Sequence, residues 1–297
     1  AGVEFEQFDN RLLNLELVKT GLTDSILFNE NGEVALASDQ FYKKNLLVAR
    51  GSYRPPTKVN VDILKTGIEN FSKDIGSKDI KPICEITISN LTTSGDIAKE
   101  DFLARVDLLA SINFPVMITN FAQYFRLTNY LSRFKPQNLS IVLGVYNFQQ
   151  IFDNDYNQLK GGILEALGLL FMEHVKVYLY PYREEKQTDE LISLDNLPVS
   201  ENKKHLLSFI SSKDQLKDIQ GFDNKILHIY SRRVLNMIKE DEDGWENQLS
   251  SLNKKSLNKG KGFSAKRVQV RSMPLSMVRQ VNRPIDVCLI DVEGHEL

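Results

Sequence analysis

The stretch LLVARGSYRPPTKVNVDIL, Leu46–Leu64, changes character twice within its length. It opens with an apolar run typical of a buried strand and ends with the apolar spacing of a helix over Val61–Phe71. The turn between them holds three basic side chains, Arg50, Arg54 and Lys58. The order of strand, basic turn and helix predicts the first unit of an alternating α/β domain.

The same alternation continues along the chain. Strand-like apolar segments follow at 81–88, 114–120, 139–145 and 175–182, and helical patterns lie between them at 99–112, 121–134 and 161–173. Several predicted strands are apolar on both faces, which is typical of a parallel sheet covered by helices. We therefore predict a Rossmann-like, doubly wound parallel sheet of the α/β class, which binds ligands at the carboxyl ends of its strands.

Three regions are predicted. Residues 1–40 form a small N-terminal α+β segment with a hairpin turn in NENGEV, residues 41–246 form the main domain, and residues 247–297 form a partial α/β fragment. The last boundary rests on charge, because Asn247 to Arg283 contains nine Lys or Arg and no Asp or Glu. Residues 184–204 are polar and are predicted to be mostly loop.

Composition excludes several classes of function. The 297 residues are 42% hydrophobic and 26% charged, as in an ordinary globular protein, and the net charge of −2 gives no reason to expect a nucleic acid or a membrane as partner. No apolar run is long enough to span a bilayer, and the first residues lack signal-peptide features. The only cysteines, Cys84 and Cys288, are expected to be buried free thiols, which indicates a cytoplasmic setting. No His, Cys, Asp or Glu cluster has metal-ligand spacing.

The basic turn has the features of a phosphate site. Backbone N–H groups at a helix start, together with the helix dipole, attract anions. Gly51 would let the chain approach a ligand closely, and Thr57 or Asn60 would cap the helix. The alternative is that the three basic side chains are solvated or pair with local carboxylates such as Asp62.

The turn GSYRPPTKVN, residues 51–60, resembles the phosphate-binding signature of the nucleotidylyltransferase superfamily, in particular the nicotinamide/nicotinate mononucleotide adenylyltransferases. In that family the first strand runs into a Gly-Ser-Phe-Asn-Pro-type turn and a later His opens the helix. The positions that match are Gly51, Ser52, Pro55 and Thr57, with Tyr53 in place of the aromatic residue and Asn60 in place of the His.

Two further stretches resemble the same family in the right order, so that the resemblance covers about residues 40–246. LSIVLGVYNFQQIFDND resembles the strand and loop with the Gly-x-Asp-Asn motif, in which Gly144 and Asn147 match and Tyr146 replaces the Asp. LHIYSRRVLNMI resembles the Ile-Ser-Ser-Thr-x-Ile-Arg motif at a helix N-terminus, in which Ile229, Ser231 and Val234 match and Tyr230, Arg232 and Leu235 depart.

The resemblance implies adenylyl transfer from ATP, with Mg²⁺, to a nicotinate or nicotinamide mononucleotide. It implies catalytic roles for Arg54, Thr57, Lys58 and Asn60, and nucleotide binding by Arg50, Gly51, Ser52, Tyr53, Gly144, Asn147, Ser231, Arg232 and Arg233. The expected partners are small-molecule nucleotides, and the sequence is compatible with a homo-oligomer. A non-catalytic nucleotide-binding module stays open as a second class, because all three motifs depart from the family pattern.

Four of the aromatic residues in the predicted helix at 121–134 have a second interpretation. Phe121, Tyr124, Phe125 and Tyr130 could stack on a base, but aromatic residues at helical spacing more often pack into a core, and the sequence favours that interpretation.

The last fifty residues resemble a different family, the FkbM-type S-adenosylmethionine-dependent methyltransferases. The elements that carry the resemblance are Ser250, Ser251 and Leu252, then Val268 and Val270, then the strand Ile290–Glu296. It implies S-adenosylmethionine as an alternative cofactor and functional roles for Asp291 and Glu293 at a strand's carboxyl end. The alternative is an ordinary strand followed by an acidic turn.

Overall fold

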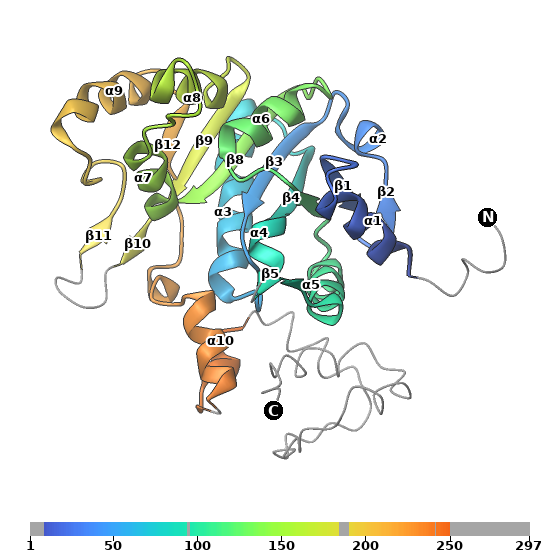
Figure 1. Cartoon of the computed structure of the whole chain (residues 1–297). Helices are drawn as coiled ribbons and strands as arrows, with labels where there is room; N and C mark the ends of the chain where they lie inside the picture. Colours follow the sequence, from blue (N-terminus) through green and yellow to red (C-terminus); the bar gives the residue numbers. More distant parts are fainter. Residues whose placement is uncertain (1–8, 94–95, 184–189, 241, 250–297) are drawn as a thin grey trace.

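The structure, a computed structural model, describes residues 9–93, 96–183, 190–240 and 242–249. Its centre is an eight-stranded sheet with the order β12-β9-β8-β3-β4-β7-β1-β2 (Figure 1). The six parallel strands are β3 (Asn45–Arg50), β4 (Ile80–Thr87), β7 (Val116–Thr119), β8 (Asn138–Gly144), β9 (Val175–Tyr180) and β12 (Leu216–Asp218).

The order of these strands makes the sheet doubly wound. The chain runs from β3 outward through β4 to β7, then crosses to the other side of β3 and runs outward through β8 and β9 to β12. The direction of winding therefore reverses between β3 and β8. In such sheets the loops diverge at this switch point and leave a crevice at the carboxyl edge. The predicted α/β, Rossmann-like fold is confirmed.

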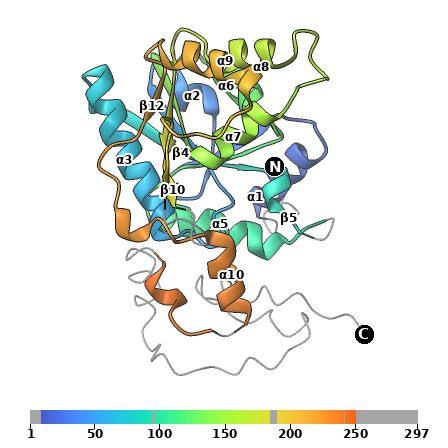
Figure 2. The same ribbon diagram turned by 90° about the vertical axis from the view of Figure 1, so that its left-hand side faces the viewer.

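Helices cover both faces of the sheet. One face carries α6 (Tyr124–Ser132), α7 (Val145–Asp153), α8 (Gly162–Leu170) and α9 (Glu201–Ser211), and the other carries α1 (Asn10–Lys19), α3 (Lys58–Ile75) and α5 (Lys99–Ser111). Figure 2 shows α3 on the opposite side of the sheet from α6 and α7. The elements that complete the described chain are α2 (Ala37–Phe41), α4 (Ile88–Leu91), α10 (Ser231–Lys239), β1 (Ser25–Phe28), β2 (Val34–Ala35), β5 (Thr92–Thr93), β6 (Asp96–Ile97), β10 (Tyr182–Arg183), β11 (Leu191–Ile192) and the short turns η2 (Asn224–Ile226) and η3 (Trp245–Asn247).

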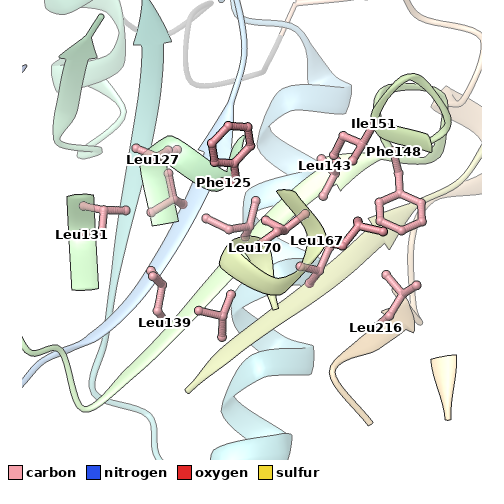
Figure 3. Close-up of a cluster of buried hydrophobic side chains, with 14 of the residues drawn as sticks. Phe125, Leu127, Leu131, Leu139, Leu143, Phe148, Ile151, Leu167, Leu170 and Leu216 are labelled. Atoms are coloured by element: carbon pink, nitrogen blue, oxygen red, sulfur yellow. The ribbon is translucent and has the colours of Figure 1, made fainter. Parts of the chain in front are cut away.

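Both faces of β3 are buried, as the sequence predicted. Leu46 and Val48 pack into the cluster on the α6–α8 side, whereas Leu47 and Ala49 pack into the cluster on the α3 side. Successive side chains of a strand point to opposite faces, so an unbroken apolar run is what a strand between two helical layers requires. Figure 3 shows part of the first cluster, to which α6, α7, α8, β8 and β12 all contribute side chains.

The N-terminal segment joins the main sheet. The predicted hairpin is present as β1 and β2, with a turn closed by Asn29 N–H donating to the Glu33 carbonyl at 2.8 Å. β1 pairs antiparallel with β7 and so extends the sheet at its edge. Residues 9–40 therefore share the hydrophobic core of the main domain, and Leu15 and Val18 of α1 are buried in it.

One expectation about secondary structure was wrong. The family resemblance placed a loop after the strand at 139–145, but Val145–Asp153 form α7, which buries Val145, Phe148, Ile151 and Phe152 on one face. Region 184–204 was predicted to be mostly loop, which its described residues confirm up to residue 200 apart from β11, and α9 begins at Glu201. In both places apolar residues at helical spacing supply the burial that stabilises the helix. Among the described helices, none is long and apolar enough to cross a membrane.

Candidate functional site

The basic turn leaves β3 at the carboxyl edge of the sheet. Gly51 N–H donates to the Glu85 carbonyl at 3.0 Å, which extends the pairing of β3 with β4 by one residue. A Cβ atom at Gly51 would lie 3.1 Å from the ring of Tyr53, so a side chain there would require the ring to shift. Tyr53 itself is buried, and its hydroxyl donates to the Ala49 carbonyl at 2.7 Å. The ring of Tyr53 thus packs inside the turn, where it holds the backbone in place.

Arg50 forms a buried ion pair. Its Nε and Nη2 donate to the two carboxylate oxygens of Glu85 at 2.6 and 3.2 Å, and Nη1 and Nη2 also donate to the carbonyls of Ala122 and Phe121, each at 2.9 Å. The Glu85 side chain is fully buried. These contacts join the carboxyl ends of β3 and β4 to the loop after β7. Arg50 therefore fixes the shape of this edge, and its charge is largely balanced by Glu85.

Arg54 turns away towards α5. Its Nε donates to an Asp101 carboxylate oxygen at 3.0 Å, and Asp101 also pairs with Arg105. Arg105 in turn donates to the Ser52 carbonyl at 3.1 Å, which links α5 to the turn. The interpretation in which the basic side chains pair with carboxylates thus holds for Arg50 and Arg54. The acceptor is not Asp62, which accepts instead from the Tyr180 hydroxyl at 2.6 Å.

The end of the turn caps α3. Thr57 is the N-cap residue, and its N–H donates to Oδ1 of Asn60 at 2.8 Å in a capping box. This confirms the predicted cap. Lys58 N–H donates to the Gln248 carbonyl at 3.0 Å, and Thr57 forms an isolated bridge with Leu249. Residues 248–249 therefore lie against the first turn of α3.

The first and third predicted motifs meet at Asn60. The Ser231 hydroxyl donates to Asn60 Oδ1 at 3.2 Å, which joins the first turn of α10 to the first turn of α3. Arg232 and Arg233 follow in the same turn of α10 and are exposed. The contact brings together residues 171 positions apart in the chain, so the first and third motifs lie next to each other.

A cavity of about 410 Å³ opens at the same edge, at the switch point between β3 and β8. Its walls come from the turn after β3, from α4, from the start of α6 and from α7. Most of the lining is polar and uncharged, supplied by Ser52, Thr87, Ser89, Asn90, Gln123, Asn147, Gln150 and Asn154. Arg50 is the one charged side chain among the described residues that line it. Amides and hydroxyls both donate and accept hydrogen bonds, so this cavity suits a polar organic group.

Tyr124 also lines the cavity. The Arg50 guanidinium lies over its ring, 4.4 Å from the centroid. Burial raises the pKa of Tyr124 to about 12, although the charge of Arg50 and a hydrogen bond with Asn147 act in the opposite direction. The hydroxyl is therefore protonated at neutral pH. Glu85, Arg50, Tyr124 and Asn147 thus form a continuous chain of contacts across the ends of the strands.

The predicted binding residues divide into two groups. Those that line the cavity are Arg50, Gly51, Ser52 and Asn147. Those that lie at the junction of α3 and α10 are Thr57, Lys58, Asn60, Ser231, Arg232 and Arg233. Gly144 ends β8 at the same edge, whereas Tyr53 is buried in the turn and Arg54 pairs with α5. Asp291 and Glu293 lie outside the described residues, so the methyltransferase-like tail stays a prediction.

Sequence reasoning missed Glu85 and left Tyr124 as a core residue. The signal for Glu85 was present, because an acidic residue inside the apolar strand KPICEITI must be paired if it is buried. Of the four aromatic residues considered for base stacking, Phe125 is in the core, Phe121 and Tyr130 pack ring to ring at 5.0 Å, and Tyr124 lines the cavity. Among the described residues, no group of His, Cys, Asp or Glu is placed to hold a metal ion.

Comparisons with known proteins assign this chain to no family. No protein-family model matches the chain, and no curated protein matches it. Among solved structures, the nicotinic acid mononucleotide adenylyltransferase of Plasmodium falciparum, complexed with APC, is similar to it, with a TM-score of 0.38 and 14% sequence identity. The match covers 66% of this chain and 84% of that chain. Values this low do not indicate a shared function.

Proposed function

We propose that this chain binds nucleotides along the carboxyl edge of its sheet. The observation that carries the proposal is the convergence of three stretches far apart in the sequence. The turn after β3 and the start of α7 line one cavity, and the turn's end touches the start of α10 through Asn60 and Ser231. Ligands of doubly wound sheets bind at this edge, next to the switch point.

The reaction we propose is adenylyl transfer to a mononucleotide such as nicotinate or nicotinamide mononucleotide. A phosphate oxygen of the acceptor attacks the α-phosphorus of ATP, the bond from that phosphorus to the β-phosphate bridging oxygen breaks, and pyrophosphate leaves. The protein's task is to position two anions in line and to stabilise the charge on the phosphates. Lys58, Arg232 and Arg233, in the first turns of α3 and α10, would supply that charge. The expected Mg²⁺ would bind phosphate oxygens.

The polar cavity would hold the uncharged part of one substrate. Asn147 and Ser52 present an amide and a hydroxyl to it, and such groups recognise ribose hydroxyls or a carboxamide. Arg50 would mainly stabilise the loops around the cavity rather than bind the substrate. Four hydrogen bonds to Glu85, Phe121 and Ala122 already engage its guanidinium.

A specific observation favours a second candidate, a nucleotide-binding module without catalysis. Asn60 stands where the resembling family has a catalytic His, and its Oδ1 accepts hydrogen bonds from Thr57 N–H, the Thr57 hydroxyl and Ser231. The side chain therefore serves as a structural cap. Asn also carries no charge with which to stabilise a phosphate.

Calorimetry with ATP and with each mononucleotide tests the proposal. We expect Asn147→Ala and Ser231→Ala each to weaken binding by about two- to tenfold, since each removes one hydrogen-bonding group. Asn14→Ala in α1, at a half-buried residue outside both groups of predicted binding residues, is the matched control and should bind as the wild type does. Pyrophosphate release on mixing both ligands separates the enzyme from the module. Wild-type protein that binds neither ATP nor a mononucleotide would contradict both.

A further inference from the structure

An exposed tyrosine lies beside a partly buried one at the carboxyl edge, outside the cavity. Tyr146 in the first turn of α7 has 55% of its surface exposed, although it is a large aromatic residue. Its ring lies 6.3 Å, centroid to centroid, from the ring of Tyr182 in β10, at an interplanar angle of 69°. Tyrosine is enriched at binding surfaces, because its ring offers apolar contact area while its hydroxyl can stay hydrated, so an exposed tyrosine beside the cavity is a candidate ligand contact.

The sheet explains why these two rings meet. β8 and β9 are parallel neighbours, and their last paired residues are Gly144 and Tyr180. Tyr146 and Tyr182 each follow two positions later, where the chain has just left its strand. Where the polypeptide leaves two adjacent parallel strands at the same level, the residues at equivalent positions after each strand lie next to each other. Among the described residues that flank Tyr146, Asn147 faces the cavity, so the tyrosine pair borders the site already described.

On its other side, the tyrosine pair is linked through Arg183 and Tyr230 to the basic first turn of α10. The Tyr230 hydroxyl donates to the carbonyl of Arg183, the residue after Tyr182, at 2.7 Å. Tyr230 is itself 36% exposed and directly precedes Ser231, which contacts Asn60 at the start of α3. The edge therefore carries, in order, a polar cavity, a pair of aromatic rings of which Tyr146 is exposed, and two helix N-termini with basic side chains.

We propose that the Tyr146–Tyr182 pair is a stacking site for the base of a nucleotide, with the phosphates directed towards the first turn of α10. A planar base is the ligand group that matches an exposed aromatic face, because stacking needs contact area and tolerates different ring substituents. This inference rests on the proposed function and names the group that binds beside the cavity. In the resembling family this position is an Asp, so the stacking surface is a feature of this chain's own sequence.

Calorimetry with adenosine, guanosine, ATP and inorganic tripolyphosphate tests the proposal on the full chain. Tyr146→Ala should weaken the binding of ATP and of the nucleosides by about tenfold or more and leave that of tripolyphosphate unchanged, because only the base loses its contact. Tyr146→Phe should keep the wild-type affinities. Tyr42→Ala removes an equally exposed tyrosine, 54% exposed, next to the opposite edge of the sheet, and should have no effect.

The outcomes separate the two claims. Wild-type ATP affinity in Tyr146→Ala, or an equal loss for tripolyphosphate, would overturn the stacking site while leaving the proposed function intact. Nucleoside binding that depends on Tyr146, without any binding of ATP or a mononucleotide, would support the stacking site and contradict the proposed function. Wild-type protein that binds no nucleoside or nucleotide would overturn the stacking site as well.

Discussion

Arg50 and Glu85 show how one buried pair can organise the end of a sheet. The two residues are register partners on β3 and β4, which puts a cation and a carboxylate next to each other at the strands' carboxyl ends. Glu85 also accepts from the Thr119 hydroxyl on β7. Hydrogen bonds thus join the carboxyl ends of β3, β4 and β7 next to the cavity. The sequence showed that Arg50 lies at a strand end, but its partner is 35 residues away, and only the register identifies it.

Loss of the Glu85 charge should destabilise the fold strongly. Glu85→Gln keeps the size of the side chain but leaves the Arg50 guanidinium buried without a counter-charge, which costs about 3–5 kcal/mol of unfolding free energy. The exposed pair Glu201–Lys204 is the control, and Glu201→Gln should change stability by no more than about 0.5 kcal/mol. Urea unfolding measures both. Equal midpoints for the two variants would show that the buried pair does not hold this edge together.

At the scale of elements, α3 lies close against the sheet at Gly67. The helix begins with the Thr57 cap and ends at Gly76, whose φ of 65° is the left-handed conformation that glycine adopts without strain. The sequence predicted a helix over Val61–Phe71 and its cap, because apolar spacing and capping residues are local signals, and the structure extends it to Ile75. It predicted α7 wrongly, although Val145, Phe148, Ile151 and Phe152 have helical spacing, because the family resemblance suggested a loop there.

Gly67→Ala tests this helix-to-sheet contact. A Cβ atom at Gly67 would lie 2.8 Å from Cγ2 of Val142 on β8 and 3.3 Å from Cδ1 of Leu47 on β3. Overpacking of this kind costs about 1–3 kcal/mol, so the unfolding midpoint should fall. Gly168→Ala in α8, where nothing lies within 4 Å, should instead raise stability by up to about 1 kcal/mol, because alanine favours the helix. A neutral Gly67→Ala variant would mean that α3 packs less closely than described.

At the scale of the whole molecule, the sheet separates two edges of different character. The carboxyl edge carries the 410 Å³ cavity, the tyrosine pair and the junction of α3 with α10. The amino edge carries a smaller cavity of about 360 Å³ with charged walls, lined by Glu30, Asp39, Lys44, Asp79 and Lys81 among others. The alternation of strands and helices predicted ligand binding at the carboxyl edge, and the larger of the two cavities lies there. It did not predict how the loops divide that edge, since contacts such as Asn60–Ser231 depend on tertiary packing.

Backbone hydrogen exchange, with and without ATP and a mononucleotide, tests nucleotide binding at the carboxyl edge most directly. We expect slower exchange at residues 51–52, 147 and 231 when both ligands are present, because these amides lie where the motifs converge. Exchange at residues 79–81, which line the amino-edge cavity, should stay unchanged and serves as the internal control. Slowing confined to residues 79–81, or no slowing at either edge at saturating ligand, would contradict the proposed function.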